Sequence, residues 1–134
     1  MTDDALLALL RAFTSRVAGI TDTALASRDG LIIASDTNGA EPDNLAALAA
    51  ASLGIAQRMA ASVGRGTLQD VTTRGSGGCV MVYPVGVAAL LVVVGDKGLD
   101  IARLHRESRP TVEAIEVVLK RGRPDAGGTG AAAS

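Results

Sequence analysis

The longest periodic segment of the chain runs from Pro42 to Val63 and predicts a helix. Pro42 suits a first helical turn, where its missing N–H has no intrahelical partner, and Gly64 and Gly66 suit a helix end. Side chains spaced by three and four residues form one largely apolar stripe, which we expect to cover the sheet of the same chain. This stripe consists of Leu45, Leu48, Ser52, Ile55, Met59 and Val63.

The opposite face of this helix carries small residues, where a solvent-exposed helix would show Lys and Glu. Arg58 is the only charged residue of the helix after Asp43. One interpretation is that alanine simply favours helix formation. The other is that a stripe of small side chains lets a second copy of the chain come close. The small face consists of Ala46, Ala47, Ala50, Ala51, Gly54 and Ala61.

Shorter apolar runs predict five β-strands, at residues 23–27, 31–35, 67–74, 79–85 and 88–94. Amphipathic stripes predict a helix at each end of the chain. The first stripe is Leu6, Leu7, Leu10, Phe13 and Val17, and the last is Ile101, Leu104, Ser108, Val112, Ile115 and Leu119. The resulting order, α-β-β-α-β-β-β-α, predicts an α+β fold with a five-stranded antiparallel sheet.

Local patterns refine this picture. Asp29-Gly30 between two apolar runs predicts a β-hairpin, because glycine tolerates the positive φ of a tight turn. Residues 88–94 contain no polar side chain, which predicts a strand covered on both faces. Residues 67–74 are polar on both faces and predict an edge strand. Pro84 is expected at a strand end, and Pro110 is expected to kink or split the last helix.

Length and composition limit the kinds of protein the chain can be. Its 134 residues predict one domain, at residues 3–122, followed by a disordered tail at 123–134 that is rich in Gly, Ala and Ser. Thirteen basic against fourteen acidic residues provide no electrostatic footprint for nucleic acid or a membrane surface. Phe13 and Tyr83 are the only aromatic residues, which disfavours base stacking and aromatic ligand pockets.

The expected location is the cytoplasm. Cys79 is the single cysteine and cannot form an internal disulfide, and Asp3 and Asp4 stand where a signal peptide would carry positive charge. The helix from Pro42 is long enough to cross a membrane, but its apolarity comes mostly from Ala and Gly, and Gln57 and Arg58 interrupt it. We therefore expect no membrane insertion.

No residue pattern predicts catalysis, a cofactor or a metal site. His105 lies on the polar side of the last helix and is interpreted as a solvated residue, and Cys79 as a small buried hydrophobe. Asp96 and Asp100 precede that helix and are better explained as caps than as cation ligands. The glycines at 75–78 lack the Lys-Ser/Thr of a phosphate-binding loop. Scattered arginines are candidates for anionic contacts: Arg28, Arg58, Arg65 and Arg74.

The edge strand and the small helix face together predict a homodimer. An open edge strand can pair with its own copy about a two-fold axis, and this pairing would bring the two internal helices alongside each other. The predicted interface consists of Leu68, Asp70, Val71 and Thr72 from the strand and Ala47, Ala50, Ala51, Gly54 and Arg58 from the helix.

The segments VAGITDTALASRDGLIIASD and GGCVMVYPVGVAALLVVV, with the alanine-rich helix between them, resemble the Roadblock family of dynein-light-chain-like proteins. The resemblance covers about residues 5 to 121 and is greatest for the bacterial branch found beside small Ras-like GTPases. It implies strand order 2-1-5-4-3, with the internal helix on one face and the terminal helices on the other. It also implies a continuous ten-stranded sheet in the dimer.

The same resemblance implies a non-enzymatic platform that binds a small Ras-like GTPase. Some bacterial members stimulate GTP hydrolysis without an arginine finger of their own. Candidate contacts are Asp43, Asn44, Arg58 and Arg65. Two alternatives stay open: a structural adaptor that binds its partner regardless of nucleotide, and a small-molecule sensor, for which this chain has few pocket-lining aromatic residues.

Overall fold

The computed structural model describes residues 2–122, which form three helices and five strands. The predicted disordered tail at 123–134 lies outside the described residues. The elements follow the predicted order: α1 Thr2–Arg16, β1 Ile20–Ser27, β2 Ile32–Asp36, α2 Pro42–Ser62, β3 Val71–Gly75, β4 Gly78–Val85, β5 Ala89–Asp96 and α3 Ile101–Arg121.

The strands form one antiparallel sheet in the order β2-β1-β5-β4-β3, as predicted. β5 is central and almost wholly buried, and β3 is an edge strand, so both placements are confirmed. β3 is shorter than expected and begins at Val71. The predicted β1–β2 hairpin is present: Ser27 N–H donates to the carbonyl of Leu31 at 2.9 Å, and Gly30 has a φ of +86°.

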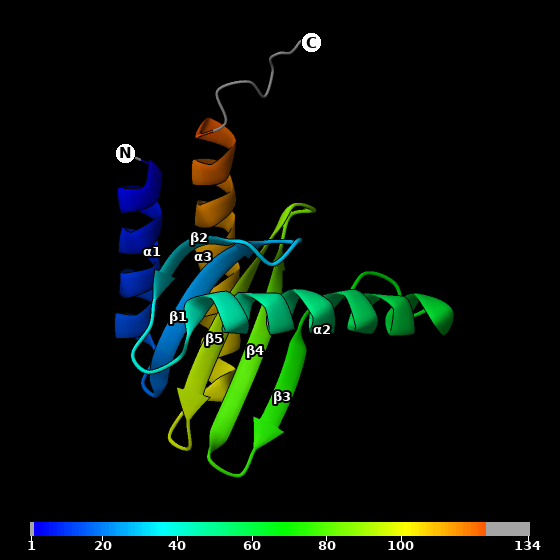
Figure 1. The fold of residues 1–134 in the computed structure, drawn as a ribbon. Helices are drawn as coiled ribbons and strands as arrows, with labels where there is room; N and C mark the ends of the chain where they lie inside the picture. The colour runs from blue at the N-terminus through cyan, green and yellow to red at the C-terminus, as the bar shows by residue number, and fades with distance from the viewer. Residues whose placement is uncertain (1, 123–134) are drawn as a thin grey trace.

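Helices cover the two faces of the sheet as expected (Figure 1). α1 and α3 lie side by side on one face, where Leu6, Leu10 and Phe13 of α1 and Leu104 and Ile115 of α3 join one buried cluster. α2 crosses the strands on the other face and packs on a second cluster. That cluster consists of Ala24, Ala26, Ala46, Ala49, Leu53, Val82, Leu90 and Val92.

The predicted core face of α2 is wrong. Leu48, Ile55 and Met59 are 62%, 62% and 64% exposed, Val63 is also exposed, and only Leu45 and Ser52 of the predicted stripe are half-buried. Ala46, Ala49 and Leu53 face the sheet instead. The physical reason lies in β1. Its Ala24 and Ala26 have short side chains, so small residues of the helix can pack close to the strand. Apart from Leu53, the large side chains named above therefore point outward or lie only partly buried.

The start of α2 is capped and its second half extends past the sheet. Asn44 N–H donates to the Glu41 carboxylate at 2.8 Å, and Pro42 occupies the first turn as predicted. Beyond Leu53 no residue of α2 is fully buried. In Figure 1 this half projects beyond β3, the last strand on that side.

Of the predicted kink or split at Pro110, the split is wrong, because α3 continues as one helix from Ile101 to Arg121. Pro110 and Arg106, whose carbonyl would accept the missing N–H, are both exposed, so water can satisfy that carbonyl. Asp100 caps the helix by accepting from Arg103 N–H at 3.0 Å, as predicted for this acid.

The loop between β2 and α2 is held by one buried carboxylate on β1. Asp22 accepts from Asn38 N–H at 2.6 Å, from Ala40 N–H at 3.1 Å and from the Thr21 hydroxyl at 2.7 Å. Burial alone would raise the pKa of Asp22, but these hydrogen bonds hold its pKa below the usual value of 3.8. Asp22 thereby fixes the chain just before α2.

Replacing this carboxylate should destabilise the domain and change its response to acid. We expect Asp22→Asn to lower the free energy of unfolding by about 1–3 kcal/mol near neutral pH. Because the folded-state pKa is lowered, the Asp22 contribution is present above about pH 4 and is lost as pH falls further. Urea titrations of Asp22→Asn and of the exposed control Asp29→Asn at pH 3 to 7 test this. Equal stability of wild type and Asp22→Asn at pH 7 would contradict it.

A second buried polar group on β1 predicts the opposite effect. The Thr23 hydroxyl is buried and has no hydrogen-bond partner among the described residues. Thr23→Val keeps the shape of the side chain and removes the unpaired hydroxyl, so we expect the free energy of unfolding to rise by about 1 kcal/mol. Urea unfolding measures it, with Thr14→Val as a control whose hydroxyl is bonded to the carbonyl of Leu10. A less stable Thr23→Val protein would refute the assignment.

Candidate functional site

The most distinctive surface of the chain is the outward face of α2. It combines the exposed large side chains Leu48, Ile55 and Met59 with exposed small residues, and Arg58 is the charged side chain among them. Single exposed apolar residues are common, but a contiguous apolar helix face usually marks an interaction site. We call this surface the α2 outer face; it consists of Ala47, Leu48, Ala51, Gly54, Ile55, Arg58 and Met59.

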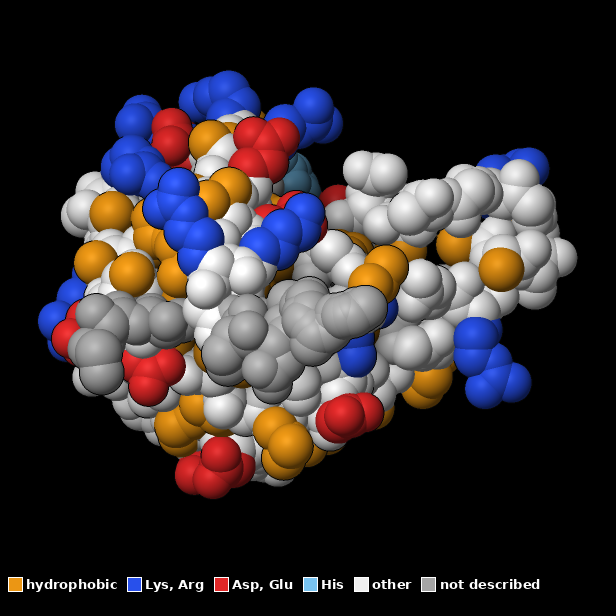
Figure 2. Space-filling view, turned by 90° about the horizontal axis from the view of Figure 1, so that it is seen from above, with side chains coloured by type: hydrophobic (Ala, Val, Ile, Leu, Met, Phe, Trp, Pro, Cys, Tyr) orange, Lys and Arg blue, Asp and Glu red, His pale blue; other side chains and the backbone are white. Residues whose placement is uncertain are grey.

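An apolar hollow lies where α2 extends past the sheet. Its volume is about 520 Å³, and its lining comes from the end of α2 and the segment leading into β3. Seen from above, most of the projecting arm is white, with a few hydrophobic and Lys or Arg side chains on its surface (Figure 2). The lining of the hollow is therefore largely apolar and partly exposed. Its lining is Ala56, Met59, Ala60, Ser62, Val63 and Leu68.

β3 is the open edge of the sheet. The opposite edge strand, β2, is half-buried along its length and packs Ile32, Ile33 and Ala34 against the two clusters. In β3 only Val71 is half-buried, and the other residues are exposed. A strand edge with free N–H and C=O groups is a template for pairing with another strand. The open edge lies directly beside the projecting half of α2 (Figure 1).

The nine residues predicted at a dimer interface gather on these neighbouring surfaces. Five are exposed and four are half-buried in the single chain, so all remain at least partly accessible. The exposed ones are Ala47, Ala51, Gly54, Arg58 and Thr72, and the half-buried ones are Ala50, Leu68, Asp70 and Val71. Leu48, Ile55 and Met59 extend the same surface, and the predicted core stripe wrongly assigned them to the interior.

The residues predicted to contact a partner are all exposed but fall into two groups. Asp43 and Asn44 lie in the first turn of α2, and Arg58 and Arg65 lie near and beyond its other end. Fourteen residues of helix separate Asn44 from Arg58, which corresponds to about 21 Å. One chain therefore presents the predicted contact residues as two separate groups, which we call half-sites: Asp43 with Asn44, and Arg58 with Arg65.

Arg28 is not a free anion-binding side chain, contrary to expectation. Its guanidinium donates to the carbonyls of Ala89 at 2.9 Å and Gly86 at 2.8 Å. These bonds tie the β1–β2 turn to the β4–β5 turn. Arg28 is therefore structural, while Arg74 on β3 is exposed.

His105 is less isolated than predicted. Its side chain is exposed, but Nδ1 lies 3.0 Å from the Tyr83 hydroxyl, and the two rings meet edge to face. Burial raises the pKa of the Tyr83 phenol, so the phenol stays protonated and can donate to Nδ1 of a neutral imidazole. Sequence reasoning missed this pair because the residues come from different elements, β4 and α3.

Other chemistry-bearing residues have structural roles. Cys79 is buried, as predicted, and Asp96 accepts from Gly98 N–H at 2.8 Å in the turn before α3. Among residues 2–122, no three His, Cys, Asp or Glu side chains lie close enough to hold a metal ion. Length and composition alone would let α2 cross a membrane, as they would for core helices of soluble domains.

Known proteins share both the sequence pattern and the fold. The family model described as the Roadblock/LC7 domain matches residues 6–95. An uncharacterized protein of Methanocaldococcus jannaschii, MJ0310, is 33% identical over 105 residues, which is 78% of this chain and 91% of that protein.

Solved structures with lower identity show the same fold. A structure described as MglB with tetrameric arrangement has a TM-score of 0.83 at 20% identity and covers 90% of this chain and 91% of that one. The gliding protein mglB of Thermus thermophilus has a TM-score of 0.80 at 21% identity, covering 90% and 93%. The chain belongs to the Roadblock/LC7 domain family.

Proposed function

We propose that this chain is a non-enzymatic, homodimeric module that binds and modulates a small Ras-like GTPase. The observation that carries the proposal is the α2 outer face beside the open β3 edge, both without a covering element among residues 2–122. The family is generally a regulatory or adaptor domain without enzymatic activity. The GTPase partner rests on the resemblance of the sequence to the bacterial branch of that family. We place the module in the cytoplasm.

Dimer formation through β3 would cover both the open edge of β3 and the apolar hollow beside α2. Antiparallel pairing of two β3 strands about a two-fold axis would give each edge hydrogen-bond partners. The second copy would then lie beneath the projecting half of α2 and fill the apolar hollow at Met59 and Leu68. The structure described as MglB with tetrameric arrangement has the same fold, and its self-association supports this proposal.

A two-fold dimer would also join the two half-sites into one surface. Two α2 helices lying antiparallel would place the first turn of one copy near the last turn of the other. Asp43 and Asn44 of one copy would then neighbour Arg58 and Arg65 of its twin. We propose this composite surface, with the apolar side chains between its charged ends, as the GTPase-binding site. Such a site exists only in the dimer.

The dimer can be tested on side chains that contribute nothing to the core of one chain. Ile55 and Met59 are more than half exposed, so Ile55→Glu and Met59→Glu should leave the monomer folded. Burial of a glutamate in an apolar interface is costly, and we expect each variant to be mostly monomeric at micromolar concentration. Light scattering reports the mass. Val117→Glu on α3, also an exposed apolar site, is the matched control and should stay dimeric. An unchanged mass for Ile55→Glu would overturn this interface.

Nucleotide dependence tests the GTPase assignment. We expect a small Ras-like GTPase encoded near this gene to bind the protein at least about tenfold more tightly when loaded with a GTP analogue than with GDP. Arg65→Glu should weaken binding by a similar factor, whereas Arg106→Glu on α3 should not. Calorimetric titration measures both. Equal affinity for the two nucleotide forms would support the structural adaptor instead.

A further inference from the structure

A second groove runs along the flank of α3, on the face of the sheet opposite α2. It consists of two adjoining hollows, of about 440 Å³ and 320 Å³, that share Glu116 in their walls. From His105 to Leu119 the groove follows 14 residues of α3, or about 21 Å. This is the length of a partner helix of four turns. We call it the α3 groove.

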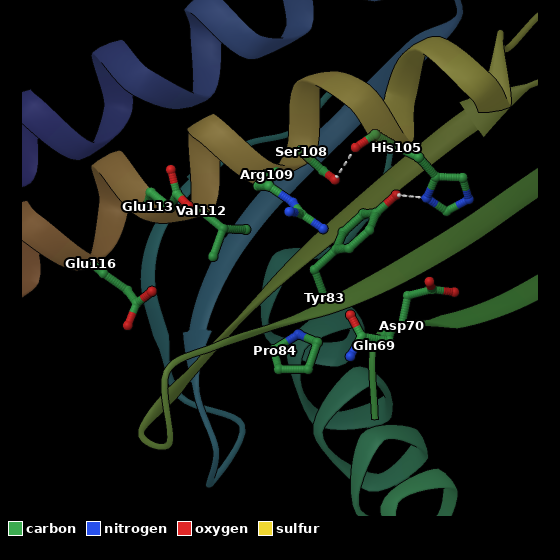
Figure 3. A pocket seen from close by; sticks show the side chains of 10 residues that line it. All are labelled: Gln69, Asp70, Tyr83, Pro84, His105, Ser108, Arg109, Val112, Glu113 and Glu116. Atoms are coloured by element: carbon green, nitrogen blue, oxygen red, sulfur yellow. Dashed lines mark hydrogen bonds between the residues drawn. The ribbon is translucent and has the colours of Figure 1, made fainter. Parts of the chain in front are cut away.

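One half of the α3 groove carries excess negative charge. Glu113 and Glu116 of α3 line it, with Asp70 of the predicted dimer interface on the opposite wall, against a single guanidinium from Arg109 (Figure 3). None of these four side chains makes an ion pair within residues 2–122, whereas Glu107 on the other side of α3 pairs with Arg16 at 3.0 Å. Glu116 is half-buried and has no hydrogen-bond partner in the same part of the chain. A half-buried, unpaired carboxylate favours a cationic neighbour.

The other half of the α3 groove is apolar. It is formed by the β4–β5 turn and the last part of α3, where Val87 is 91% exposed and Leu119 is half-buried. Its charged lining residues are the shared Glu116 and, at the end of the groove, Lys120. Such a hollow fits one or two aliphatic side chains. Arg28 holds this turn through its bond to the carbonyl of Gly86, so the apolar wall is preformed.

The sheet beside the groove is not suited to strand addition. Pairing of β3 with β4 ends at Val71 and Val82, which leaves residues 83–85 of β4 without a partner on that side. Pro84 lies within this open stretch and has no N–H to donate. An occupant is therefore held by its side chains, which favours a helix over an added strand.

We propose that the α3 groove docks a basic, amphipathic helical segment of a partner protein. An aliphatic residue of that segment enters the apolar hollow at Val87 and Leu119, and Lys or Arg side chains one to three turns away face Glu116 and Glu113. Charge complementarity disfavours phosphate groups of nucleic acid or lipid, which would meet carboxylates, and a second copy docked through the same groove, which would bring the same carboxylates.

This site is separate from the proposed GTPase surface. α2 and α3 lie on opposite faces of the sheet (Figure 1), so one dimer could hold a GTPase on the α2 side and a basic segment on the α3 side. The proposed contacts of the basic segment, at Glu113, Glu116, Val87 and Leu119, use no residue of the predicted dimer interface, so their test can succeed or fail independently of the dimer and of the GTPase.

The test selects binding peptides from a library and then locates their binding site on the protein by NMR. A random 16-residue peptide library displayed on phage is panned on the full chain, with counter-selection on Glu113→Lys/Glu116→Lys. The most enriched peptide is then titrated into ¹³C-methyl-labelled protein. We expect enriched sequences with an aliphatic residue followed by Lys or Arg at helical spacing. We also expect methyl shifts at Val87 and Leu119, without shifts at Ile55 or Met59 of α2.

Variants separate the two halves of the groove. Glu113→Lys/Glu116→Lys and Val87→Asp should each weaken binding of the enriched peptide at least about tenfold, and higher salt should weaken it further. Asp4→Lys on α1 is the control for a change of charge and should bind normally. Thermal unfolding and light scattering confirm that each variant is folded and keeps the wild-type mass. Enrichment of acidic peptides, binding unaffected by the groove variants, or shifts confined to α2 would overturn the proposal.

Discussion

The structure depends on the close packing of alanines between α2 and β1. Ala46 and Ala49 of the helix meet Ala24 and Ala26 of the strand, and small residues on both sides allow the backbones to approach. A Cβ on Gly30 would lie only 3.1 Å from Cα of Ala47, which shows the same closeness at the β1–β2 turn. Small residues line this interface where α2 crosses β1, and Leu53 is the one large side chain of α2 that is fully buried in it, while Leu48, Ile55 and Met59 face outward. An apolar outer surface is the consequence.

The predictions that succeed are those that depend on local sequence signals. Periodicity and turn residues are enough to predict all eight elements and the hairpin at Asp29-Gly30, because those signals are local. The polarity of residues 67–74 and the unbroken apolar run at 88–94 correctly separate an edge strand from a central one. The strand order itself comes from the resemblance to a family, since pairing between distant strands leaves no local signal.

The errors have a common physical cause. The position of each side chain depends on the element that packs against it, and the local sequence does not specify that element. The sequence pattern assigns Leu48, Ile55 and Met59 to the core because large apolar side chains usually lie there. The sequence of α2 alone does not reveal that β1 presents alanines. In the same way, Tyr83 with His105, and Arg28 with the β4–β5 turn, become partners only when the sheet brings them together. Pro110 stays within α3 because its missing hydrogen bond faces water.

The two faces of the sheet thus present different chemistry. The α2 side is apolar with arginines at its far end, and the flank of α3 combines carboxylates with one apolar hollow. Recognition of other chains is the activity that we propose for this arrangement, with self-association as its first step.

Concentration-dependent hydrogen exchange of the wild-type protein tests that first step most directly. If two β3 strands pair, amides of β3 at 71–75 should be protected at high protein concentration and should lose protection on dilution, together with a fall from twice the 13.5 kDa chain mass to that mass itself. Exchange at β3 that is fast and independent of concentration, in a protein of 13.5 kDa, would contradict the account.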